Sequence, residues 1–202
     1  MTHADPYAGR LSPPPRPALA RRAGALGWHD DAVGWIERIT AGWFTGLILR
    51  FAFASVLLTY YLNSAWGSLD GSLLNVLSPN DGAFAAMVPP VMEAAGYDKA
   101  EVAWPWHVFV TLGVIGELVL PVLIVLGLLT RIAAVGMIVV VFVQSYVDVV
   151  FHGLEEKSVG AAFDRFPDAV IFDQRLLWVA ILAVIAVRGP GTLSVDRLLR
   201  RP

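Results

Sequence analysis

The sequence predicts an all-α fold, a four-helix transmembrane bundle in which the helices run up and down in alternation and both chain ends face the cytoplasm. Three observations predict this fold. Of the 202 residues, 56% are hydrophobic and only 16% are charged, whereas soluble domains carry about 25% charged residues. Four apolar stretches have roughly the 20 residues that a helix needs to cross a hydrocarbon layer about 30 Å thick. Arginines concentrate in the two chain ends and in one turn between apolar stretches.

The N-terminal part is expected to lie outside the bilayer core. Residues 1–26 are rich in proline, alanine and arginine and lack a periodic pattern, so we expect a disordered tail. In residues 27–42, apolar side chains recur at helical spacing with charged side chains between them. This pattern predicts an amphipathic helix lying in the membrane interface. Residues 43–190 should then form the transmembrane domain, and residues 191–202 a cytoplasmic tail.

The four spans are expected at about residues 44–66, 106–128, 131–151 and 172–188. The second and third make the clearest pair, because two long apolar runs are separated by little more than Arg131. An apolar helical hairpin of this kind could instead be the core of a large soluble protein. This chain is too short to cover two such helices with a soluble shell. Residues 67–104 are interrupted by prolines and should form an outer loop with one or two short helices.

The distribution of basic residues predicts the orientation, because loops rich in lysine and arginine stay in the cytoplasm. The N-terminal segment, the turn between the second and third spans, and the C-terminal segment carry most of the arginines. The loops after the first and third spans are acidic and hold few basic residues. Both chain ends are therefore predicted to be cytoplasmic. The arginines that lead to this prediction are Arg10, Arg16, Arg21, Arg22, Arg38, Arg131, Arg188, Arg197, Arg200 and Arg201.

Composition also excludes several classes of function. The formal net charge is −2, and no basic face is concentrated enough to neutralise nucleic-acid phosphates, so we expect no nucleic-acid partner. The chain contains no cysteine, which excludes disulfides, thiolate metal sites and iron–sulfur ligation. A redox role would therefore require a bound cofactor or a partner subunit.

Two ionisable residues fall deep within the expected spans. Arg50 lies early in the first span, and Glu117 lies near the middle of the second. Charges at this depth usually face the bundle interior and pair with one another, so we take both as candidate catalytic residues. Three interpretations remain open: a structural ion pair, a proton-carrying or quinone-binding carboxylate at Glu117, and an Arg50 that reaches the cytoplasmic interface alone.

A second polar set lies near the outer ends of the spans. Gln144, Asp148 and His152 are four residues apart and should line one face of the third span. His107 opens the second span, and Tyr60 lies toward the end of the first. Tyrosine and histidine can hydrogen-bond a quinone carbonyl, and two histidines with a carboxylate can ligate a transition metal. The alternative is that these side chains only meet water and lipid head groups. We take the five as candidate cofactor-binding residues and assign no metal site, because no tight motif such as HExxH occurs.

The stretch GELVLPVLIVLGLLTRIAAVG, residues 116–136, resembles the DoxX family, whose members carry Gly-Glu, an apolar run and Gly-Leu-Leu-Thr-Arg. An arginine early in the first span, here Arg50, is a further similarity. The ending GPGTLSVDRLL, residues 189–199, is similar to the tail of that family. The resemblance covers most of the chain beyond the N-terminal tail. It implies that Arg50, Glu117 and Arg131 are the positions to compare with the family.

What the resemblance implies is a four-helix, multi-pass protein of the inner (plasma) membrane. Some relatives are described as the membrane subunit of thiosulfate:quinone oxidoreductase, and others as partners in sulfur, thiol-stress or metal-handling systems. We therefore expect a membrane subunit of a quinone-linked redox system, with a soluble or membrane partner and quinone as the candidate cofactor. The alternative is a non-enzymatic scaffold, or a partner that handles a small solute or metal ion. Ser194 and Asp196 look like a cap for a short C-terminal helix.

Overall fold

The computed structural model describes residues 27–199, so the predicted disordered tail (1–26) and the end of the cytoplasmic tail (200–202) lie outside the described residues. Helix α1 (Gly27–Thr40) forms a unit separate from the one that begins at Ala41. The amphipathic segment predicted there is helical, and its Trp35 and Ile36 side chains are exposed. That this helix lies in the membrane interface stays a prediction.

Four stretches of helix are long and apolar enough to cross a membrane, which confirms the predicted four-helix bundle. Each begins and ends within about two residues of its predicted bounds. The spans are Phe44–Ser68, formed by α2 (Phe44–Phe53), η1 (Ala54–Leu58) and α3 (Thr59–Ser68); α6 (Trp104–Leu126); α7 (Thr130–Val150); and Val170–Arg188, formed by η4 (Val170–Arg175) and α9 (Leu176–Arg188).

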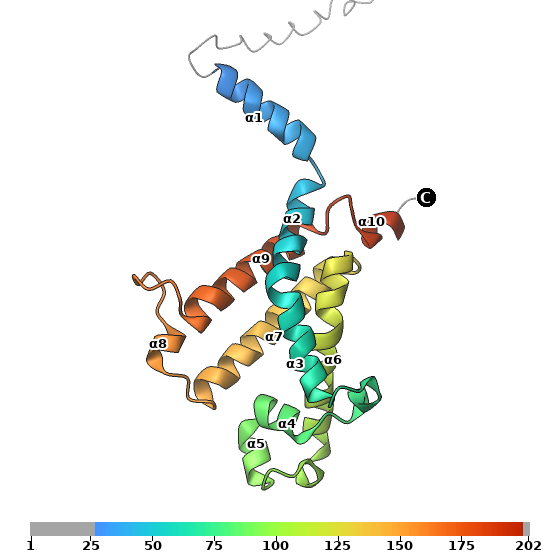
Figure 1. Ribbon diagram of the computed structural model, residues 1–202, viewed down its shortest axis with the longest axis vertical. Coiled ribbons are helices and arrows are strands. Elements are labelled where there is room, and N and C mark those ends of the chain that lie inside the picture. Colours follow the sequence, from blue (N-terminus) through green and yellow to red (C-terminus); the bar gives the residue numbers. More distant parts are fainter. Residues whose placement is uncertain (1–26, 200–202) are drawn as a thin grey trace, which may run out of the picture. The chain divides into compact units, whose positions relative to one another are not determined.

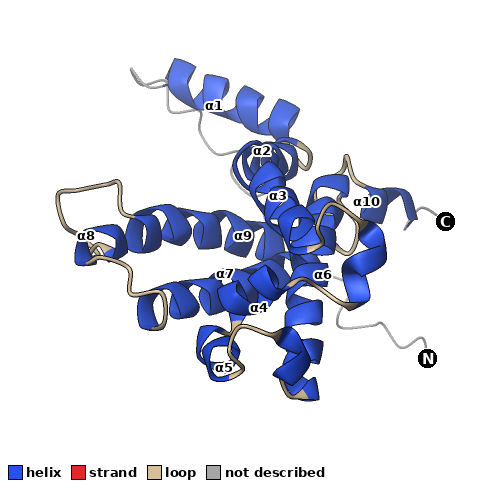
Figure 2. Cartoon of the chain, turned by 60° about the horizontal axis from the view of Figure 1, so that its bottom comes forward, coloured by secondary structure: helices blue, strands red, loops and turns tan. Residues whose placement is uncertain are grey.

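Successive spans run in opposite directions, as the colour sequence in Figure 1 shows. Helix α7 packs along both α6 and α9, while α3 packs on α6 and α2 packs on α9. The shared core contains fully buried side chains from every span, such as Phe53, Tyr61, Ile124, Met137 and Leu182. Within the described residues all regular structure is helical (Figure 2).

The outward-facing surface of the spans is apolar. Only between 17% and 28% of the residues in the most apolar window of each span are buried. Large side chains such as Ile132, Phe142 and Val187 are therefore exposed, at 71%, 61% and 73%. Contiguous exposed apolar surface of this extent is stable where lipid surrounds the helices. The chain is a multi-pass membrane protein.

Two of the spans contain π-helical segments, η1 in the first and η4 at the start of the fourth. A π turn holds an extra residue and turns the following side chains to a new face, often at functional sites. The last residue of η4 is Arg175, whose side chain is buried in the bundle.

The segment between the first two spans folds over one end of α3 and α6. It contains η2 (Leu73–Leu77), α4 (Asp81–Met87), α5 (Pro89–Ala94) and η3 (Lys99–Glu101). Phe84 and Met92 are fully buried there and form a second core with Val110 and Val114 of α6. This segment therefore rests on the bundle through apolar contacts, and it supplies one side of the cavity described below.

The C-terminal segment returns to the turn between α6 and α7. Gly127 has a φ of +73° in that turn, and a Cβ there would lie 2.8 Å from an Arg50 guanidinium nitrogen. Helix α10 (Val195–Leu199) begins just after Ser194, whose Oγ accepts a hydrogen bond from Arg197 N at 3.2 Å. Ser194 therefore caps α10 as expected, whereas Asp196 binds the first residues of α7.

Candidate functional site

Arg50 is buried in the first span, with 6% of its surface exposed. Its guanidinium donates to the carbonyl of Gly46 at 3.3 Å, to that of Val125 at 2.9 Å, and to that of Leu193. Val125 belongs to the last turn of α6, where carbonyl oxygens have no partner within the helix. Arg50 thus joins the first span, the end of α6 and the C-terminal segment. These contacts are structural.

Glu117 lies in α6 and is also buried, with 4% of its surface exposed. Ser64 Oγ in α3 donates to its carboxylate at 2.9 Å. Of the three interpretations left open by the sequence, the ion pair between Arg50 and Glu117 is not formed, because among the described residues each side chain binds other groups. Arg50 meets α6 at Val125, about two turns or roughly 12 Å further along the helix than Glu117. Within residues 27–199, Glu117 makes no salt bridge with a cationic side chain.

A cavity of ≈ 320 Å³ lies between α6 and α7, with the end of α4 on one side. Glu117 lines it together with Gln144 and Asp148. The sequence placed Gln144 and Asp148 on one face of the third span, and the structure brings Glu117 to the same cavity. We call this space the α6–α7 cavity. Small-molecule sites have volumes of about 300–1,000 Å³. The α6–α7 cavity lies at the lower end of this range, so it matches the size of a head group with a single ring.

The walls of the α6–α7 cavity are otherwise largely apolar. They include Leu112 of α6 and Val139 of α7, which are 62% and 57% exposed. Since both side chains lie on the outer surface of the spans, the cavity reaches the lipid-facing side of the bundle. A ligand with a polar head and an apolar tail would therefore enter from lipid and bring its head toward the buried carboxyl of Glu117.

Two neighbouring tyrosines, Tyr60 and Tyr61, hydrogen-bond the side-chain amide of Gln144. Tyr61 in α3 donates its hydroxyl to Gln144 Oε1 at 3.2 Å, and Gln144 Nε2 donates to the hydroxyl of Tyr60 at 3.3 Å. The two rings meet edge to face with centroids 5.0 Å apart. Tyr60, a predicted site residue, therefore orients Gln144 and does not line the cavity itself. An amide nitrogen has two N–H groups, so Gln144 keeps one for a ligand.

Asp148 is paired with Arg175, a residue that the sequence analysis did not include in the site. The guanidinium of Arg175 donates to the Asp148 carboxylate at 2.5 Å and to Ser145 Oγ at 3.2 Å. Arg175 is buried, at 5% exposure, and its Nε has no hydrogen-bond partner among residues 27–199. Asp148 is therefore a counter-ion as well as a cavity residue. A carboxylate within a membrane span usually pairs with a cation. That requirement was the one signal in the sequence that could have indicated Arg175 as the partner of Asp148.

The two histidines do not meet at the site. His107 Nε2 lies 3.0 Å from the carbonyl oxygen of Lys99, and its ring contacts Phe84 with centroids 4.8 Å apart. His152 Nε2 lies 3.1 Å from the carbonyl oxygen of Ala86. Neither histidine lines the α6–α7 cavity. The structure thus places both histidines against the backbone of the segment between the first two spans, and it does not bring them together with Gln144 and Asp148.

A metal centre built from these side chains is not formed. Over residues 27–199 no group of three or more histidine, cysteine, aspartate or glutamate side chains could hold a metal ion. His107 and His152 each bind a main-chain carbonyl, and Asp148 binds Arg175. The two histidines and the carboxylate that could have ligated a metal therefore do not come together. What remains is a buried carboxyl and an amide at membrane depth, which can exchange a proton and donate a hydrogen bond.

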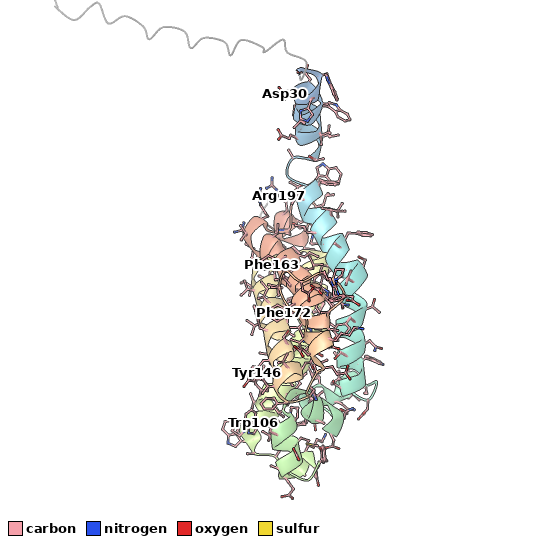
Figure 3. The ribbon with its side chains drawn as sticks, turned by 90° about the vertical axis from the view of Figure 1, so that its left-hand side faces the viewer. Asp30, Trp106, Tyr146, Phe163, Phe172 and Arg197 are labelled. Atoms are coloured by element: carbon pink, nitrogen blue, oxygen red, sulfur yellow. The ribbon has the colours of Figure 1, made fainter. Side chains whose placement is uncertain are left out.

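Ser64 and Tyr61 are the other residues that sequence reasoning left out of the site. Both lie in α3, three residues apart, and therefore share a face of that helix. Ser64 binds Glu117, and Tyr61 binds Gln144. Figure 3 shows Tyr146, two residues after Gln144, and Trp106 lying toward one end of the bundle and Arg197 toward the other. The site thus occupies the half of the bundle away from the C-terminal segment.

Comparison of this chain with known protein families, with curated proteins and with solved structures found no match.

Proposed function

We propose that this chain is the membrane subunit of a quinone-linked redox system, and that the α6–α7 cavity holds the quinone head group. One observation carries the proposal: a buried carboxyl, Glu117, and an amide, Gln144, face the same apolar-walled cavity at membrane depth. A quinone has polar carbonyls on a flat ring and an apolar tail. Its ring would lie between α6 and α7, and its tail would pass Leu112 and Val139 into lipid.

The roles of the two polar residues follow from their chemistry. Reduction of a quinone to a quinol takes up two electrons and two protons. Gln144 would donate a hydrogen bond to one ring oxygen, and the Glu117 carboxyl would give one proton to the other ring oxygen and be reprotonated between turnovers. The second proton would come from water and go to the oxygen beside Gln144. Ser64, which donates to Glu117 at 2.9 Å, positions the carboxylate. The electrons come from a partner subunit, because this chain has no cysteine to supply a dithiol.

The setting of this proposal is the inner (plasma) membrane, with both chain ends in the cytoplasm. The arginines of the N-terminal and C-terminal segments support that orientation. The resemblance of residues 116–136 and 189–199 to the DoxX family supports a link to sulfur or thiol chemistry. A scaffold that only holds a soluble partner at the bilayer, or passes a small solute, is the second class, and the same experiment separates the two.

The test is purification in mild detergent, followed by solvent extraction and titration with a short-chain quinone. We expect quinone to co-purify, and the titration to saturate at one quinone per chain. Glu117→Gln keeps an acceptor for Ser64, so the protein should stay folded and bind quinone while quinol formation with the partner present falls at least tenfold. A quinone-free preparation that does not bind the added quinone, yet carries a stoichiometric partner, would support the scaffold class.

A pair of glycine variants locates the binding site. A Cβ on Gly113 would lie 2.8 Å from Met87 Sδ, a flexible side chain at the cavity wall, so Gly113→Val fills the α6–α7 cavity. A Cβ on Gly116, one turn along α6, has ordinary contacts at 3.7 Å, so Gly116→Ala is the matched control. We expect Gly113→Val to weaken quinone binding at least tenfold and Gly116→Ala to leave it unchanged. Equal binding by both variants would exclude this cavity.

A further inference from the structure

A second cavity, of ≈ 490 Å³, lies where the α6–α7 turn, the end of α9 and the C-terminal segment come together. Figure 1 shows α10 at the same end of the bundle as α2. The charged residues on its wall are Arg131, Arg188, Arg197 and Asp196. We call it the basic cavity. It is separate from the α6–α7 cavity, with which it shares no lining residue.

The basic cavity has a surplus of positive charge. Among residues 27–199, none of its three arginines makes an ion pair with a carboxylate. The acidic residue on the wall, Asp196, accepts hydrogen bonds from Leu129 N at 2.8 Å, from Thr130 N at 3.0 Å and from Thr130 Oγ1 at 2.9 Å. Its carboxylate is therefore directed at the first turn of α7, where a negative charge is favourable.

Contacts with neighbouring residues fix Arg131 and the backbone at Arg197. A Cβ on Gly189 would lie 3.2 Å from Nε of Arg131, so this guanidinium rests on the glycine backbone. Ser194 Oγ accepts from Arg197 N at 3.2 Å and donates to the carbonyl of Gly191 at 2.9 Å. These bonds fix the start of α10 against the rest of the wall. Arg131 and the start of α10 thus belong to a defined part of the wall.

The basic cavity also lies at the boundary of the hydrocarbon layer. Helix α6 ends at Leu126, α7 begins at Thr130 and α9 ends at Arg188, so three spans leave the membrane here. Two apolar residues on its wall, Leu129 and Ile132, are 56% and 71% exposed. Cationic groups at the interface beside exposed apolar surface are the features that recognise lipids with anionic head groups.

We propose that the basic cavity binds the phosphate group of an anionic phospholipid, whose acyl chains lie along Leu129 and Ile132. Guanidinium groups recognise phosphate through paired, charge-assisted hydrogen bonds. A soluble phosphate ester offers the same phosphate but has no chains, so the exposed apolar residues favour lipid as its source. This proposal rests on the membrane-spanning fold and the basic cavity, and is independent of quinone binding.

The experiment measures lipid affinity of the full chain in detergent by native mass spectrometry. Phosphatidylglycerol and phosphatidylcholine with identical acyl chains are titrated separately, and glycerol 3-phosphate is tested as a soluble competitor. We expect tighter binding of phosphatidylglycerol, and no displacement of it by millimolar glycerol 3-phosphate. Equal affinity for the two lipids in the unaltered protein would overturn the proposal, and so would full displacement by the soluble ester.

Paired variants then test whether the arginines form the site. Each arginine near the membrane surface contributes about fivefold to the binding of an anionic lipid. Arg131→Gln with Arg188→Gln should therefore weaken phosphatidylglycerol binding roughly 25-fold, while phosphatidylcholine binding stays unchanged. Arg131→Lys with Arg188→Lys, which keeps both charges and guards against a folding defect, should lose less than tenfold.

The matched control removes two positive charges elsewhere. Lys157→Gln with Arg165→Gln removes the same charge from the segment between α7 and η4, where Lys157 lies in the short helix α8 (Glu156–Val159) and both side chains are exposed. We expect this control to bind phosphatidylglycerol like the unaltered protein. An equal loss in the control and in the Arg131 and Arg188 pair would show that overall charge governs binding, and would overturn the assignment to the basic cavity.

Discussion

Asp148 and Arg175 form an ion pair across two helices, with 2.5 Å between the carboxylate and the guanidinium. The side chain of Arg175 is 6% exposed and that of Asp148 is 25% exposed. The pair is therefore asymmetric, because the cation is buried more deeply than the anion. Because Asp148 lines the α6–α7 cavity with Gln144, the pair lies beside the candidate site.

Because Arg175 is buried more deeply than Asp148, substitution of Asp148 should lower the stability of the protein more than substitution of Arg175. Asp148→Asn leaves Arg175 charged and buried without a counter-ion, and should lower the free energy of unfolding by about 3 kcal/mol. Arg175→Gln leaves Asp148 partly exposed to solvent and should cost less. The measurement is the unfolding midpoint in detergent. Arg165→Gln, which removes an exposed arginine, should stay within about 0.5 kcal/mol, and a larger loss from Arg175→Gln than from Asp148→Asn would contradict this account.

Arg50 should control whether the C-terminal segment stays docked. Arg50→Met removes donors to the carbonyls of Gly46, Val125 and Leu193, at a cost of about 3 kcal/mol. We expect trypsin to cleave after Arg197 at least tenfold faster in this variant. Cleavage after Arg165, in the exposed loop, serves as the internal reference and should not change. Unaltered cleavage at Arg197 would mean that Arg50 does not hold the segment.

Gly46 allows the first span to approach the C-terminal segment closely. A Cβ there would lie 2.5 Å from the carbonyl oxygen of Pro190, which is backbone and has little room to move. Gly46→Ala should therefore destabilise the bundle by about 2–3 kcal/mol. Gly67→Ala, later in the same span, meets no atom within 4 Å and should stabilise α3 by about 0.5–1 kcal/mol. Thermal unfolding in detergent compares the two, and equal midpoints would refute the close contact.

The orientation prediction can be tested with reporters in a bacterial membrane. Alkaline phosphatase fused after the C-terminus should be inactive, and a green fluorescent protein fused there should fluoresce, because both chain ends are predicted to be cytoplasmic. Alkaline phosphatase inserted after Phe163, in the loop between α7 and α9, should be active. The opposite pattern at both positions would reverse the orientation.

Much of the fold was accessible from the sequence because lipid imposes simple rules. A span needs roughly 20 apolar residues and satisfies its own backbone hydrogen bonds, so the four spans were placed within about two residues. Helical spacing also put Gln144 and Asp148 on one face of the third span. That Glu117 joins them at the α6–α7 cavity was not visible, because the spacing within one helix says nothing about the rotation of its neighbour.

By itself, the sequence determined that this chain crosses the membrane four times and which polar groups must be accommodated at that depth. Only the tertiary structure decided their partners: Arg50 with the carbonyls at the end of α6, Glu117 with Ser64, and Asp148 with Arg175. The physical reason is that a buried polar group pairs with whichever group packing brings within about 3 Å. Helix rotation, depth and the π turn of η4 set those distances, and each depends on contacts between residues far apart in the chain.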